Sequence, residues 1–312
     1  MTWRPSLKTS LIIVVAVLIV ATIALVGAQI FNSNPRPYEK PPVTDYVLPI
    51  KALPPNGTTT KVDLEKAVEM VKNIWDVPSQ EPSAKILQDT IEGRVYWSLA
   101  WASNGRVVVT SLVDADTGEV VFVRDFRYTA KADNIGDMKD VVALAKEVLK
   151  RLGIREEFLS EPFVRRYRGH QDELHEDILY DVEWGQLYKG LPVLGGYVAV
   201  TINPELKRPV GFVVKLVDVR EVDVNPHISK DEAIKIAEEF LRSRGYRPLK
   251  VTDVNLAIGR PNYYWEGTPK LMGAPTLLWV MKFEVAMGSL TTQANVQVDA
   301  HSGEVVGGDL YR

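Results

Sequence analysis

Val-Asp-Ala-Asp-Thr-Gly-Glu-Val-Val occupies residues 113–121, and Val-Asp-Ala-His-Ser-Gly-Glu-Val-Val occupies residues 298–306. Seven of the nine positions are identical, so the chain contains an internal repeat. In both copies the Gly follows an Asp and a Thr or Ser, between two valine-rich runs. A polar side chain can cap a tight turn there and Gly accepts a positive φ, which is typical of a β-hairpin. We therefore expect each copy to form the turn between two antiparallel strands.

An amphipathic helix is expected ahead of each β-rich part of the chain. Before the last repeat, Ser229 and Glu232 form a capping box, apolar residues follow at helical spacing, and Gly245 supplies a stop. Similar apolar stripes run through residues 64–75 and 138–152. The sequence thus alternates a helix with a group of strands three times.

These three units predict an α+β fold of tandem modules, each a helix packed on a small antiparallel β-sheet. The boundaries that we expect are 60–129, 130–223 and 224–312, because helix caps and the Asp223–Pro226 break fall near them.

The N-terminus predicts a transmembrane helix. Leu11 to Ile30 is an uncharged, predominantly apolar run that follows Arg4 and Lys8, and twenty helical residues span about 30 Å, the thickness of a bilayer core. Residues 1–31 therefore read as a membrane anchor with the body outside the cytoplasm. The alternative is a secretory signal peptide cleaved near Val26-Gly27-Ala28, which leaves the body secreted.

A proline-rich tether is expected at residues 32–59, because its seven prolines disfavour both helix and central strand. Asn56 begins an Asn-Gly-Thr triplet, which is a possible glycosylation site.

The composition and the motifs that are missing exclude several classes of function. There are no cysteines, which excludes disulfides, thiolate catalysis and Cys-ligated zinc. The formal charge is -3, so the mildly acidic chain has no broad electrostatic reason to bind nucleic acid. No phosphate-binding Gly-rich loop, nucleophile elbow or dinucleotide fingerprint occurs.

The repeats resemble the PepSY superfamily, which includes the propeptide modules of thermolysin-like metalloproteases and related repeats in envelope and spore proteins. Residues 113–121 and 298–306, with their upstream helices, look like PepSY modules. Residues 182–196 are similar to the fungalysin/thermolysin propeptide variant. The resemblance implies a helix-on-sheet fold and a role in inhibiting or assisting a peptidase, or in binding another envelope protein. It implies no catalytic residue. This chain departs from the pattern where His301 replaces the Asp116 of the first copy.

Metal sites receive little support from the sequence. His170 and His175 are five residues apart, which would place them on different faces of a helix, so we interpret them as part of a polar linker. Asp114 begins a run that starts like a calcium loop, but Glu119 stands where an EF-hand needs Gly, so a capped turn is the better reading. We therefore expect no metal and no cofactor.

An acidic run follows the His170–His175 segment. Paired carboxylates can perform acid–base chemistry or hold a cation, but such runs are more often solvated, and a contact surface for a basic partner is a further reading. We interpret it as a solvated face made by Asp172, Glu173, Glu176, Asp177, Asp181 and Glu183.

We expect a non-enzymatic, extracytoplasmic, membrane-anchored protein that binds or inhibits an envelope protein such as a peptidase. The alternatives are an envelope scaffold or adhesion protein and, third, a hydrolase of unrecognised type. Tyr263, Tyr264 and Trp265 lie in a polar, proline-flanked stretch, and Tyr and Trp are common at binding hot spots. They are the expected partner contacts, although packing of the same loop on the sheet is an equal alternative.

Overall fold

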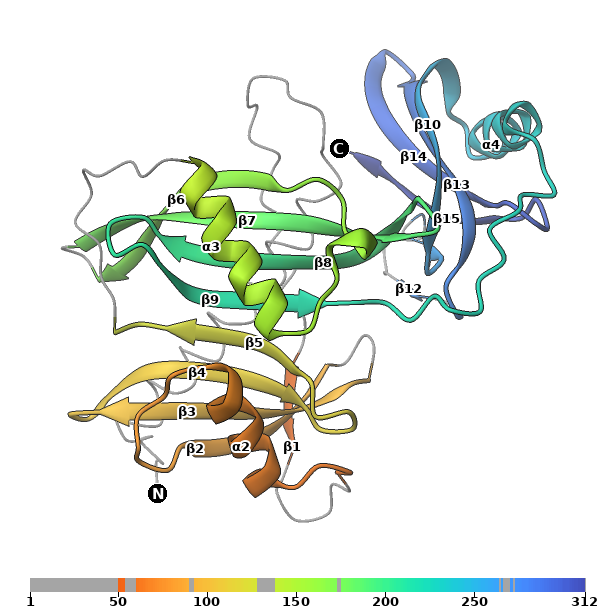
Figure 1. Cartoon of the computed structure of the whole chain (residues 1–312). Helices are drawn as coiled ribbons and strands as arrows, with labels where there is room; N and C mark the ends of the chain where they lie inside the picture. Colours follow the sequence, from red (N-terminus) through yellow and green to blue (C-terminus); the bar gives the residue numbers. More distant parts are fainter. Residues whose placement is uncertain are drawn as a thin grey trace, which may run out of the picture. The chain divides into compact units, whose positions relative to one another are not determined.

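The computed structural model describes residues 50–53, 60–89, 93–127, 138–172, 175–263, 265, 270–271 and 273–311 (Figure 1). The expected anchor at residues 11–30, Asn56 and nearly all of the tether lie outside the described residues. The chain divides into two compact units. The first contains described residues up to Arg155 together with Glu161–Trp184 and Tyr197–Lys215, and the second contains Glu156–Ser160, Gly185–Gly196 and the described residues from Leu216 onward.

The first unit is dominated by antiparallel strands that are hydrogen-bonded side by side (Figure 1). In spatial order they are β1 (Ile50–Leu53), β2 (Ser83–Asp89), β3 (Val95–Ser103), β4 (Arg106–Asp114), β5 (Val120–Asp125), β9 (Arg208–Lys215), β8 (Leu191–Asn203), β7 (His175–Tyr188) and β6 (Phe163–Asp172). Strands β7 and β8 continue into the second unit beyond Trp184 and before Tyr197.

Two amphipathic helices cover this sheet (Figure 1). Helix α2 (Leu64–Ile74) packs on β3 and β4, and helix α3 (Met138–Arg151) packs on β9. Each helix buries an apolar stripe at the spacing that the sequence predicts. The buried residues are Ala67, Val68 and Val71 in α2, and Val141, Ala145, Val148 and Leu149 in α3.

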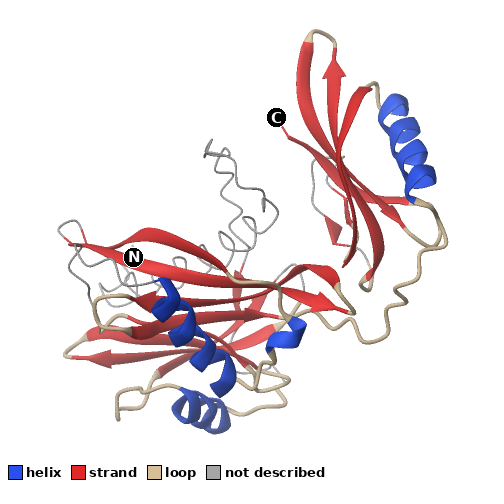
Figure 2. Ribbon diagram, turned by 45° about the horizontal axis from the view of Figure 1, so that its top comes forward, coloured by secondary structure: helices blue, strands red, loops and turns tan. Residues whose placement is uncertain are grey.

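The second unit lays one helix on a smaller group of strands (Figure 2). Its antiparallel core consists of β10 (Arg247–Gly259), β13 (Thr276–Met287), β14 (Leu290–Asp299) and β15 (Val305–Tyr311). Short strands β11 (Asn262–Tyr263) and β12 (Lys270–Leu271) extend the edge at β15, and a 3-10 helix, η2, spans Glu156–Phe158. Ser229 is the N-cap of helix α4 (Lys230–Ser243), and its side chain accepts a hydrogen bond from the Glu232 amide, so the Ser229 half of the predicted capping box is confirmed.

The expectation of tandem modules, each with its own small antiparallel sheet, is wrong. Strands from the first and second expected modules share one sheet, because β5 pairs with β9 through Phe122↔Val213 and its neighbours. Strand pairing within the second unit is also mixed: Val193 of β8 pairs parallel with β10, and β11 pairs parallel with β15. An exposed strand edge leaves backbone N–H and C=O groups unpaired, and pairing β5 with β9 satisfies both edges at once. No helix within the described ranges is long and apolar enough to cross a membrane.

Candidate metal centre

The turn between β14 and β15 confirms the hairpin chemistry expected of the repeat. Asp299 Oδ1 accepts hydrogen bonds from the backbone N of His301 at 2.9 Å and of Ser302 at 2.8 Å. Thr276 Oγ1 donates to Asp299 Oδ2 at 2.8 Å, which holds the carboxylate in place. Gly303 has a φ of +80°, a conformation that costs other residues free energy. This turn fixes the backbone of His301.

A second segment is attached to the same turn. The backbone N atoms of His227 and Ile228 donate to Ala300 O at 2.9 and 3.0 Å. Trp279 Nε1 donates to Ile228 O at 3.0 Å, and the Ile228 side chain is buried in the core under α4. His227 is therefore held beside His301, although the two residues are far apart in the sequence.

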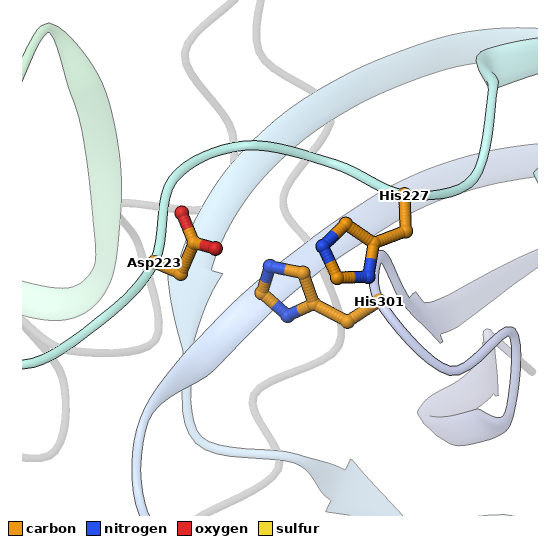
Figure 3. A group of neighbouring side chains, drawn as sticks. All are labelled: Asp223, His227 and His301. Carbon is orange, nitrogen blue, oxygen red and sulfur yellow. The ribbon is translucent and has the colours of Figure 1, made fainter.

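Three side chains converge where the segment meets the turn (Figure 3). The nearest possible ligand atoms of Asp223, His227 and His301 all lie within 4.8 Å of one another. The two imidazole rings meet edge to face, with centroids 4.9 Å apart and an interplanar angle of 66°. Figure 3 shows a ring nitrogen of His301 turned toward the Asp223 carboxylate. This is the only such group of three among the residues that the structure describes.

Two further features of this group are compatible with cation binding. His301 Nε2 is buried and has no hydrogen-bond partner, which is costly for a ring nitrogen unless something satisfies it. Hydrogen bonds from the Asn225 backbone and side chain to Asp223 Oδ1 lower the pKa of Asp223, and both His side chains add to this effect. Asp223 is therefore a carboxylate at neutral pH, and its other oxygen makes no hydrogen bond in the described structure.

The donor set suits a divalent transition metal. Imidazole nitrogen and carboxylate oxygen bind Zn²⁺ at about 2.0–2.2 Å, so two ligands of one tetrahedral ion lie about 3.3 Å apart. The observed separations of up to 4.8 Å are wider, so the exposed Asp223 and His227 side chains would have to rotate to bind one ion together with His301. Three protein ligands leave one tetrahedral position open.

Comparison with known proteins found a distantly similar solved structure but no matching family or curated sequence. No protein-family profile matches the sequence, and no curated protein sequence matches it significantly. Among solved structures, the chain is similar to the Bacillus megaterium YpeB C-terminal domain, with a TM-score of 0.40 and 14% sequence identity over 81% of this chain and 100% of that one. A likeness at this level carries no argument about function, so the PepSY resemblance remains an expectation from the sequence.

The sequence pattern did not predict this group, and the pair of histidines that it singles out lies elsewhere. His170 and His175 lie in β6 and β7, not in a linker, and belong to the first unit. The signal that points to the observed site is His301, which stands at one of the two positions where the copies of the repeat differ, because the first copy has Asp116 there. No spacing rule links it to His227, because only the β14–β15 turn brings the two together.

The expected contact residues are placed only in part. Trp265 packs against α4, with its ring 5.2 Å from that of Phe240 and 6.1 Å from that of Tyr246, and its Nε1 donates to Gly307 O at 3.3 Å. Tyr264 and the side chain of Tyr263 lie outside the description. Trp265 therefore packs on its own unit, and a partner contact through the two tyrosines stays a prediction.

The acidic run is not a solvated face at Asp181 and Glu183, so that expectation is wrong for these two. Both lie on β7 and are buried, 7% and 6% exposed. Arg165 on β6 donates to Glu183 Oε1 at 2.6 Å and to Asp181 Oδ2 at 3.3 Å, and Thr201 donates to Asp181 Oδ1 at 2.7 Å. Burial, with a smaller contribution from the Asp181 carboxylate, raises the pKa of Glu183 to about 7 despite Arg165. Burial also raises the pKa of Asp181.

Proposed function

We propose that this chain is a non-enzymatic binding protein whose C-terminal unit holds a divalent transition-metal ion through Asp223, His227 and His301. The observation that carries the proposal is the convergence of two imidazoles and an ionised carboxylate, with a buried ring nitrogen that lacks a partner. Zn²⁺ is the proposed occupant, because Ca²⁺ and Mg²⁺ favour sites made of oxygen ligands.

The metal proposal is tested by calorimetric titration of the chelator-stripped, full-length protein with Zn²⁺. We expect one ion per chain, and we expect His301→Ala to weaken binding on the order of 100-fold or more, because one of three protein ligands is lost. The matched control is the double variant His170→Ala with His175→Ala, which removes two histidines outside the group and should bind as the unchanged protein does. Equal affinity in His301→Ala and the unchanged protein would refute the site.

We also propose that the protein is anchored through residues 11–30, works outside the cytoplasm and docks on another envelope protein such as a peptidase. The support is the uncharged apolar run with basic residues before it, together with the PepSY resemblance of the repeats. An aromatic contact through Tyr263 and Tyr264 fits this role, because tyrosine supplies a large contact area with a polar tip.

The docking proposal predicts that Tyr263→Ala with Tyr264→Ala reduces capture of an envelope peptidase from native membranes at least tenfold, with the fold unchanged by circular dichroism. Trp265 is left in place because it packs on α4. The control is Leu290→Ala, which removes an apolar side chain of the same unit that is 63% exposed. Undiminished capture by the double Tyr variant would rule out this contact.

A further inference from the structure

The turn that carries His301 has a counterpart in the first unit, and the same hydrogen bonds build both. In the first unit, the backbone N atoms of Lys61 and Val62 donate to Ala115 O at 3.1 and 3.0 Å. In the second unit, His227 and Ile228 make the same pair of bonds to Ala300 O. Lys61 therefore corresponds to His227.

The correspondence extends to the side chains around the turns. Trp97 Nε1 donates to Val62 O at 2.8 Å, just as Trp279 Nε1 donates to Ile228 O. Asp114 Oδ1 accepts from the backbone N of Asp116 at 2.9 Å, as Asp299 Oδ1 accepts from that of His301. Asp116 and His301 thus occupy equivalent positions.

The chemistry at the two equivalent pairs differs. In the first unit, Lys61 Nζ lies 3.7 Å from Asp116 Oδ1, and both side chains are well exposed, so this ion pair adds little stability and depends on no ligand. In the second unit, the same two positions carry imidazoles, which cannot form an ion pair with each other. The Asp223 carboxylate completes a group that a cation would hold together.

We propose that the metal ion ties the segment before α4 to the β14–β15 turn, in the place where the first unit uses an ion pair. This metal clasp, made of Asp223, His227 and His301, rests on the proposed metal binding and assigns it a role. The three ligands come together only while the segment before α4 is attached to the turn. The ion therefore stabilises this closed form over a form in which the segment has detached.

Detachment has a specific structural cost that the clasp opposes. It breaks the bonds from the His227 and Ile228 amides to Ala300 O, uncovers the buried Ile228 side chain and disturbs Ser229, the cap of α4. A ligand that binds only the closed form lowers the population of the detached form by the factor 1 + [L]/Kd. The second unit should therefore respond to metal at this segment, and the first unit should not.

Amide hydrogen exchange on the full-length protein, with and without Zn²⁺, tests the clasp. At a free Zn²⁺ concentration 100 times the Kd, the His227 and Ile228 amides should exchange about 100-fold more slowly. The Lys61 and Val62 amides, which make the equivalent bonds in the first unit, should keep their rates and serve as the internal control.

The matched variant carries His227→Lys with His301→Asp, which installs the residue pair of the first unit. It should fold, because the first unit accommodates the same pair at the equivalent turn, and its exchange at residues 227 and 228 should no longer depend on Zn²⁺. If calorimetry shows Zn²⁺ binding by the unchanged protein but exchange at these amides does not slow, the clasp is refuted and metal binding stands. Equal slowing of Lys61 and Val62 also refutes the clasp, whereas absence of Zn²⁺ binding refutes the proposed function itself.

Discussion

Replacing Arg165 by Met is expected to lower the free energy of unfolding by about 3–5 kcal/mol at pH 8, because two buried carboxylates lose the cation that contacts them both. Arg165 is itself largely buried, with 19% of its side chain exposed, and its 2.6 Å contact to Glu183 is short. Met fills a similar volume but donates no hydrogen bond. The loss therefore comes from leaving charge uncompensated rather than from a cavity.

The cost should depend on pH. The folded-state pKa of Glu183, about 7, exceeds its unfolded value of 4.5, so the folded protein binds a proton between these pH values and the unfolded chain does not. Stability from this group is thus present at low pH and is lost as the pH rises from about 4.5 to about 7. Without Arg165 the pKa of Glu183 rises further, so Arg165→Met should cost less at pH 5 than at pH 8.

Denaturant unfolding at both pH values measures this effect. The double variant Arg165→Met with Glu183→Gln should regain part of the stability at pH 8, because one buried charge has been removed. Arg220→Met is the matched control: Arg220 also makes a 2.6 Å contact, to Asp218, but both side chains are exposed, so no measurable change is expected. A loss for Arg165→Met no larger than that for Arg220→Met would contradict the prediction.

Replacing Phe283 by Ala is expected to destabilise the second unit by about 3–5 kcal/mol. Phe283 is fully buried on β13, in the cluster where Ala237 and Leu241 of α4 meet Val296 of β14. Truncation removes buried apolar surface and leaves a cavity between α4 and the strands, which a close-packed interior fills only in part.

The measurement is denaturant unfolding followed by tryptophan fluorescence, because Trp279 lies against the same cluster. Phe163→Ala removes the same side chain from a position that is 61% exposed, and it should change stability by less than about 0.5 kcal/mol. Similar losses for the two variants would show that Phe283 does not anchor the core of this unit.

Local elements of this protein could be predicted from the sequence, because neighbouring residues determine them. The Asp-x-x-[Ser/Thr]-Gly turns supply their own capping carboxylate and left-handed glycine, so residues 113–121 and 298–306 form hairpins as expected. Ser229 caps the start of α4 by accepting a hydrogen bond from the amide of Glu232, three residues further along the chain. The apolar stripes of the helices face the core.

Pairings between distant segments were decided by the tertiary structure. Period-two patterning predicts a strand but not its neighbour, so it did not reveal that β5 pairs with β9 and merges two expected modules. The run of acidic residues likewise predicted that the side chains of Asp181 and Glu183 are exposed to solvent. The sequence does not show that Arg165 lies opposite them on β6.

The candidate metal site illustrates the same division. The sequence by itself determined that His301 departs from the repeat, and that the turn holding it is capped by Asp299. Only the tertiary structure decided that His227 and Asp223 lie beside it, because that proximity depends on two backbone hydrogen bonds to Ala300 across a long chain separation. Metal ligands are selected by distance in space, and a single sequence records distance only along the chain.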